Sequence, residues 1–167
     1  MAELTQKERL QPSLLDRLTD DEPHQQQESR EKRVLSMSKL RQSVVRDISW
    51  LLNARSLDTV IDLEQYPEVA TSVLNFGIKD LSGTNVSGAD LTAIERSLQQ
   101  AIKNFEPRIL PQSLNLQVVS AEDKMNNQAM QFDIEADLWS QPLPLHLYLR
   151  SEMDTLTGDF ELHDMDG

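Results

Sequence analysis

The chain has 167 residues, the size of a single domain with a short extension. It contains no cysteine, which excludes disulfides, thiolate nucleophiles and every metal site that uses a cysteine ligand. The formal net charge is −12, and residues 113–167 carry eleven acidic side chains against only Lys124 and Arg150. A surface of this sign repels phosphate backbones, so we expect no nucleic-acid partner.

No apolar run in the sequence is long enough to cross a bilayer. The amino-terminal sequence MAELTQKERLQPS lacks the apolar segment of a signal peptide. We therefore expect a cytoplasmic protein without direct membrane insertion. The absence of cysteine fits a reducing compartment.

Residues 1–33 are predicted to form an extended N-terminal arm that precedes an α+β domain at 34–167. The stretch DDEPHQQQESREKR contains no apolar residue and cannot contribute to a core. Within the arm, Leu14, Leu15 and Leu18 fall on one face of a helical turn. Such a turn is too short to be stable alone. It suits docking, either on another protein or back on its own domain.

The first helix of the domain is expected at about 38–53, because apolar residues recur there at helical spacing. Trp50 lies off this stripe, either as a second packing contact or as a binding anchor. The residues of the stripe are Leu40, Val44, Ile48, Leu51 and Leu52.

A short second helix is expected to begin at Pro67 and to end at Gly77. Its predicted buried side is Val69, Ala70, Val73 and Leu74. A third helix is expected to begin with Ser87 and Asp90, which resemble a capping box, and to end at Pro107. Its predicted buried side is Leu91, Ile94, Leu98, Ala101, Ile102 and Phe105.

After Pro111 the apolar period changes to two, which predicts antiparallel strands with one wet face. Turns are predicted at Asn126-Asn127 and at Gly158. Helices followed by a meander make an α+β fold with an open edge strand, expected at Leu143–Arg150 or Asp159–His163. The inward-facing residues, strand by strand, are Leu114, Leu116 and Val118; Met130, Phe132, Ile134, Ala136 and Leu138; Leu143, Leu145, Leu147 and Leu149; and Phe160 and Leu162.

No arrangement of side chains indicates catalysis, and we expect no catalytic residue. The histidines His24, His146 and His163 have no metal-ligand spacing, so we expect neither a metal nor a cofactor. No serine or threonine lies in a nucleophile-elbow motif. The carboxylates of the predicted strand at 130–138 project from an open face, which cannot desolvate a carboxylate enough to make it a general acid.

The sequence FEPRIL joins the last helix to the first strand. Pro107 stops the helix, while Glu106 and Arg108 carry opposite charges on either side of it. They are expected to pair with each other or to reach nearby backbone. Two interpretations remain open, a rigid corner and a polar knuckle that faces a partner.

Four segments, PSLLDRLTDDEP, RDISWLLNAR, YPEVATSVLNFGIKDLSG and FEPRIL, resemble in this order the TssE family. These are wedge subunits of the type VI secretion baseplate, related to a small wedge protein of contractile phage tails. The resemblance covers nearly the whole chain, and FEPR, SVLN-aromatic-Gly and DLSG are its most specific parts. Lys79 departs from the pattern, which has a proline before Asp80.

The resemblance implies a cytoplasmic structural subunit, not an enzyme, that links other baseplate wedge proteins to contractile sheath subunits and seeds sheath assembly. It also implies that strands of the sheath complete the sheet. Related phage proteins are described as lysozyme-like, so the alternative is a peptidoglycan hydrolase. The partner-binding residues that the family motifs imply are Leu14, Leu15, Arg17, Leu18, Glu106, Pro107 and Arg108.

Overall fold

The structure is a computed structural model that describes residues 13–19, 24, 37–82, 88–119, 129–140 and 143–165. Most of the predicted arm, the predicted Ser87 cap and the Asn126-Asn127 turn lie outside the described residues. The helices are α1 (Leu14–Leu18), α2 (Met37–Leu52), α3 (Pro67–Ala70) and α4 (Gly88–Phe105), with 3-10 turns η2 (Leu57–Thr59) and η3 (Val73–Asn75). The strands are β1 (Asn115–Val119), β2 (Ala129–Leu138), β3 (Leu145–Asp154) and β4 (Phe160–Asp164).

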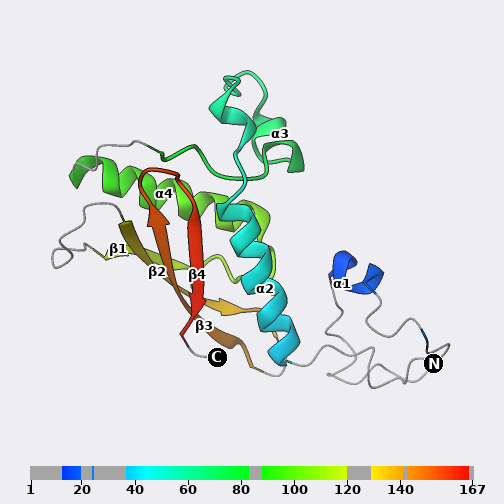
Figure 1. Ribbon diagram of the computed structural model, residues 1–167. Coiled ribbons are helices and arrows are strands. Elements are labelled where there is room, and N and C mark those ends of the chain that lie inside the picture. Colours follow the sequence, from blue (N-terminus) through cyan, green and yellow to red (C-terminus); the bar gives the residue numbers. More distant parts are fainter. Residues whose placement is uncertain are drawn as a thin grey trace.

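The four strands form one antiparallel sheet in the order β1-β2-β3-β4 (Figure 1). The predicted α+β fold with an open sheet is confirmed. β3 pairs with both of its neighbours, so the expectation of an edge at Leu143–Arg150 is wrong, and β4 is the edge. β1 is a second edge, on the opposite side of the sheet.

Helices α2 and α4 pack on one face of the sheet, and their apolar residues join those of the strands in a single core. Every second residue from Met130 to Leu138 is buried in β2, as the period of two predicts. The predicted stripe of α2 is buried as well. The residues of β2 that face the other side of the sheet are Gln131, Asp133, Glu135 and Asp137. No helix of the described part of the chain covers this polar face (Figure 1).

Asn53, which follows α2, and Glu95 of α4 reach the backbone of the two edge strands with their side chains. The side-chain amide of Asn53 donates to Phe160 O at 3.0 Å and accepts from Phe160 N at 2.9 Å, as a neighbouring strand would. On the other edge, Glu95 Oε1 accepts from Val118 N at 2.8 Å. Each edge is therefore partly capped, which opposes edge-to-edge aggregation.

The region between α2 and α4 departs most from the prediction. Pro67 does start a helix, but α3 ends at Ala70, and Val73 and Leu74 are 82% and 69% exposed instead of buried. The cause is local, because the Asn75 side chain donates to Ala70 O and accepts from Asp58 N, which replaces the bonds of a longer helix.

Two smaller predictions also need correction or completion. Leu143 is exposed, because β3 begins only after Pro144, which has no N–H to donate to a ladder. Trp50 is exposed as well, with the guanidinium of Arg46 at 5.0 Å from the centre of its ring. The turn at Gly158 has a φ of +79°, as a glycine turn permits.

Candidate partner-binding site at the Glu106–Arg108 corner

The corner between α4 and β1 is a turn whose backbone is tied to β2. Pro107 is exposed on its outside, and Ile109 is buried on its inside. Trp139 N donates to Arg108 O at 2.7 Å, and Leu110 N donates to Asp137 O at 2.9 Å. These two bonds fix the path of the chain from the end of α4 to the edge of the sheet.

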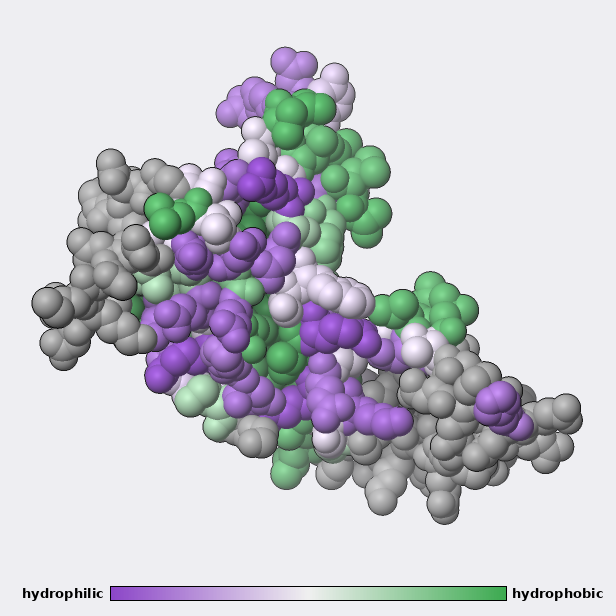
Figure 2. Space-filling view, viewed as in Figure 1, coloured by the Kyte–Doolittle hydropathy of each residue, from purple (hydrophilic) through white to green (hydrophobic). Residues whose placement is uncertain are grey.

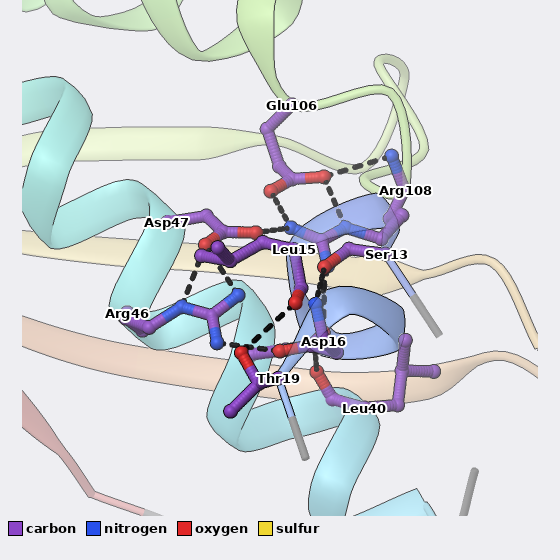
Figure 3. Close-up of polar contacts among 10 residues, drawn as sticks. Ser13, Leu15, Asp16, Thr19, Leu40, Arg46, Asp47, Glu106 and Arg108 are labelled. Atoms are coloured by element: carbon purple, nitrogen blue, oxygen red, sulfur yellow. Dashed lines mark hydrogen bonds and ion pairs between the residues drawn. The ribbon is translucent and has the colours of Figure 1, made fainter. Parts of the chain in front are cut away.

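Glu106 and Arg108 form a closed pair across this turn (Figure 3). Arg108 Nε donates to Glu106 Oε1 at 2.7 Å, and Arg108 Nη2 donates to Oε2 at 2.5 Å. The backbone N of Arg108 donates to the same carboxylate at 3.0 Å. Both predicted contacts, the charge pair and the backbone bond, are present. Glu106 is only 4% exposed, so its carboxylate is used inside the protein.

The guanidinium of Arg108 also reaches across to α2. Its Nη2 donates to Asp47 Oδ2 at 2.5 Å, and its Nη1 donates to the hydroxyl of Ser43 at 3.1 Å. Burial lowers the pKa of Arg108, but the bonds to Glu106 and Asp47 outweigh this and raise the pKa above its ordinary value. Arg108 is therefore a fixed cation that joins the corner to α2.

The same chain of charges continues to the arm. Asp47 Oδ1 accepts from Arg46 Nε at 2.9 Å, and Arg46 Nη1 donates to Asp16 Oδ1 in α1 at 2.5 Å. The hydroxyl of Ser13 donates to Asp16 and also caps the start of α1. The series from α1 through Arg46, Asp47 and Arg108 to the corner is called the ionic relay below.

The ionic relay holds α1 against the rest of the chain by polar contacts, while the apolar residues of α1 face outward. Leu14, Leu15 and Leu18 are 72%, 43% and 74% exposed. Arg17 lies in the same helix, and its side chain is outside the described set. The structure thus brings the arm motif and the glutamate-proline-arginine motif into one region of the molecule.

Sequence reasoning missed the residues that join the two motifs. Ser43 and Asp47 are four residues apart and so share one face of α2, beside the apolar stripe. That spacing was a usable signal of a polar contact at the edge of the core. Nothing in the sequence indicated that Asp16, inside the leucine motif, would pair with Arg46.

One carboxylate on the polar face of the sheet, Asp133, is poorly suited to be the general acid of a hydrolase. A shallow depression of about 310 Å³ is lined by Asn115, Gln117, Asp133, Glu135, His146 and Tyr148. A hydrogen bond from Arg150 lowers the pKa of Asp133 below its ordinary value, with a smaller contribution from Tyr148. A general acid for glycoside hydrolysis needs the opposite shift.

The described residues contain no cluster of three or more acidic or histidine side chains placed to hold a metal ion. None of the helices in this part of the chain has the length and hydropathy of a membrane span.

Comparison with known families decides the identity of the domain. The sequence model of the family described as baseplate wedge protein gp25 matches residues 38–143. The chain belongs to this family. The gp25 family is a family of structural baseplate proteins, so association with other baseplate components is expected of this member. The match includes α2 and the Glu106–Arg108 corner, and it starts after α1.

Other comparisons add little. A crystal structure from Geobacter sulfurreducens, named as a "putative tail lysozyme", is similar with a TM-score of 0.46 and 20% identity. The similarity covers 69% of this chain and 90% of that one. At this level it supports no argument about activity. None of the curated proteins matches the chain significantly.

Replacing Arg108 by methionine should destabilise this gp25-family domain, because it leaves the buried Glu106 carboxylate without its partner. Breaking a buried pair from one side costs about 3–5 kcal/mol. Chemical denaturation measures this loss, and adding Glu106→Gln should recover part of it. Arg150→Met, which removes a more exposed pair with Asp133, is the control and should cost much less stability. Equal losses for the two single variants would contradict this assignment.

Docking of α1 should depend on the charge of Asp16. Burial raises the pKa of this carboxyl, but hydrogen bonds from Arg46 and Ser13 outweigh it and hold the pKa below its ordinary value of 3.8. Because the pKa of Asp16 is lower in the docked state, its negative charge stabilises docking at pH values above 3.8. This stabilisation is lost as the pH falls through the lowered pKa. Asp16→Asn should therefore release α1 at neutral pH.

Release can be measured as a distance between spin labels. The chain has no cysteine, so single cysteines at the exposed positions Leu18 and Gln42 take the labels cleanly. The distance distribution should broaden in the Asp16→Asn variant and stay narrow in Asp62→Asn, which removes a carboxylate from an exposed loop. An unchanged distribution in Asp16→Asn would show that the ion pair does not hold α1.

Proposed function

We propose that this protein is a non-enzymatic, cytoplasmic wedge subunit of a type VI secretion baseplate, which links the wedge to the contractile sheath and seeds sheath assembly. Membership in the gp25 family supports the baseplate part of this proposal. The resemblance of four ordered segments to TssE supports the type VI assignment. The observation that carries the link to the sheath is the edge strand β4.

The backbone groups of β4 alternate between β3 and the open side. Asp154 N donates to Asp159 O, and Met165 N donates to Tyr148 O, so the odd-numbered residues of this segment face β3. Phe160 and Leu162 therefore direct their backbone groups outward. Asn53 occupies those of Phe160, so Leu162, in the middle of the strand, is the position at which we expect an added strand to bond.

A sheath strand that pairs at Leu162 would extend the sheet without any chemistry in this subunit. The acidic side chains of β4 and its neighbours discourage pairing with a second copy of the same edge. They also favour a partner strand that carries basic residues. The sheet would then act as the template on which the first sheath ring forms.

Leu162→Pro should abolish sheath polymerisation, because it removes an outward N–H while leaving the β3 ladder in place. Val118→Pro, which removes the N–H that donates to Glu95 on the opposite edge, is the control for loss of an edge bond and should leave seeding intact. Glu161→Pro is unsuitable, since Glu161 pairs with Glu152 inside the sheet. Normal seeding by folded Leu162→Pro protein, or by protein N-methylated at Leu162 through semisynthesis, would rule out strand addition at β4.

The second part of the proposal is that α1 binds the rest of the wedge through its leucines. Their exposure on a helix held in place by Asp16 leaves them free to enter a partner's pocket. Of the corner motif, Glu106 is buried, so Pro107 and the outer edge of Arg108 are the parts that can contact a partner next to α1. The motif's first role is to support this surface.

Changing Leu14, Leu15 and Leu18 to alanine should abolish co-purification with wedge proteins and leave the melting temperature unchanged. Each leucine that becomes buried contributes about 1.5–3 kcal/mol to binding. Leu143→Ala with Leu156→Ala, two exposed leucines elsewhere, is the matched control. Retention of wedge proteins by the triple variant would show that α1 is not the anchor.

A further inference from the structure

The lobe between α2 and α4, residues 53–82, exposes a group of large apolar side chains. Figure 2 shows apolar surface gathered over the lobe that carries α3 in Figure 1. Soluble monomers rarely expose apolar side chains as a group unless the group is a binding surface. The exposed members, called the lobe surface below, are Val60, Ile61, Tyr66, Val73, Leu74 and Phe76.

Polar bonds hold the base and the turn of the lobe in shape. Its base is a pair of bonds in which Ser56 N donates to Ile78 O and Ile78 N donates to Ala54 O, both at 2.9 Å. Gly77 has a φ of +129°, and a Cβ there would lie 2.5 Å from Ala54 O. Asn75 fixes the turn above this base, as described for η3.

The lobe is also tied to the site described above. The ring of Phe76 meets that of Phe105, the last residue of α4, edge to face at 5.5 Å between centroids. Glu106 follows directly. The lobe surface therefore stands on a support fixed by polar bonds and by the contact of Phe76 with Phe105, while its other apolar residues make no part of that support.

Acidic side chains outnumber basic ones in the lobe. The two cations of residues 53–82 lie at its base, where Arg55 has Asp80 at 3.3 Å, and residues 56–78 contain no lysine, arginine or histidine. Asp58 has Lys79 at 3.5 Å. The remaining carboxylates of this segment are exposed, and none has an ion pair with a described residue; they are Asp62, Glu64 and Glu68.

We propose that the lobe surface binds an amphipathic helix of another wedge protein, one whose apolar stripe is flanked by lysine or arginine residues. A helix fits better than a strand, because the described backbone of the lobe is engaged in turns and offers no strand edge. A second copy of this chain is disfavoured, since two acidic rims on a protein of charge −12 would face each other. The surface is separate from the leucines of α1 and from β4. Of the proposed function, this inference needs only the membership in the gp25 family, and neither the type VI assignment nor the link to the sheath.

The test uses overlapping synthetic peptides of about 20 residues, long enough for several helical turns, that cover the sequences of the other wedge proteins of the same baseplate. Binding to the full chain is measured by fluorescence anisotropy. A basic peptide with apolar residues at helical spacing should bind and become helical. Val73→Ser with Leu74→Ser should weaken it at least about tenfold, because two exposed apolar side chains are lost from the contact.

Two further variants separate the contributions. Replacing Asp62, Glu64 and Glu68 by their amides should weaken binding and reduce its dependence on salt. The Leu14, Leu15 and Leu18 alanine variant is the matched control and should bind the same peptide normally. The proposal is overturned if no basic amphipathic peptide binds, if Val73→Ser with Leu74→Ser binds unchanged, or if sedimentation shows that the lobe surface joins two copies of the chain.

Discussion

The guanidinium of Arg108 lies between two carboxylates that come from different parts of the chain, Glu106 at the end of α4 and Asp47 in α2. One of these carboxylates is almost fully buried, so its charge is tolerable only while Arg108 stays in place. The cation thereby fixes the distance between the two helices at the point where the chain enters the sheet. α4 and the residue after α2, Asn53, in turn supply the side chains that cap β1 and β4.

The proposed binding surfaces share this support. α1 reaches it through Arg46 and Asp47, the α3 lobe reaches it through Phe76 and Phe105, and β4 lies beside α2. None of the three surfaces needs a change of its own fold to meet a partner. A subunit of this kind contributes to an assembly by holding several contacts at fixed relative positions, which a rigid corner favours over a flexible one.

Much of this architecture can be predicted from the spacing at which apolar residues recur in the sequence. The stripe of α2 and the alternation along β2 place their residues in the core correctly, because burial in a two-layer fold is set by those periods. The arm and corner motifs were also found, since their residue types stand out from their surroundings. The identity of β4 as an edge followed only in part, because strand order depends on pairing between segments that the sequence does not specify.

Both failures come from polar side-chain contacts, one local and one between distant segments. Val73 and Leu74 were expected in the core because apolar residues at helical spacing usually are, but Asn75 ends the helix through its own side-chain bonds. The relay from Asp16 to Arg108 was missed because it joins positions far apart in the chain. Polar contacts between distant segments leave no period, so they appear only when the fold is known.

A double-mutant cycle between Asp47 and Arg108 tests most directly whether this cation joins α2 to the corner. The free energies of unfolding of Asp47→Asn, Arg108→Met and the double variant are compared with that of the unchanged protein. The account predicts that the two losses do not add, with an interaction energy of about 1 kcal/mol or more, as for residues in one ion-pair network. Losses that add to within about 0.3–0.5 kcal/mol would show that the two residues act independently and would contradict it.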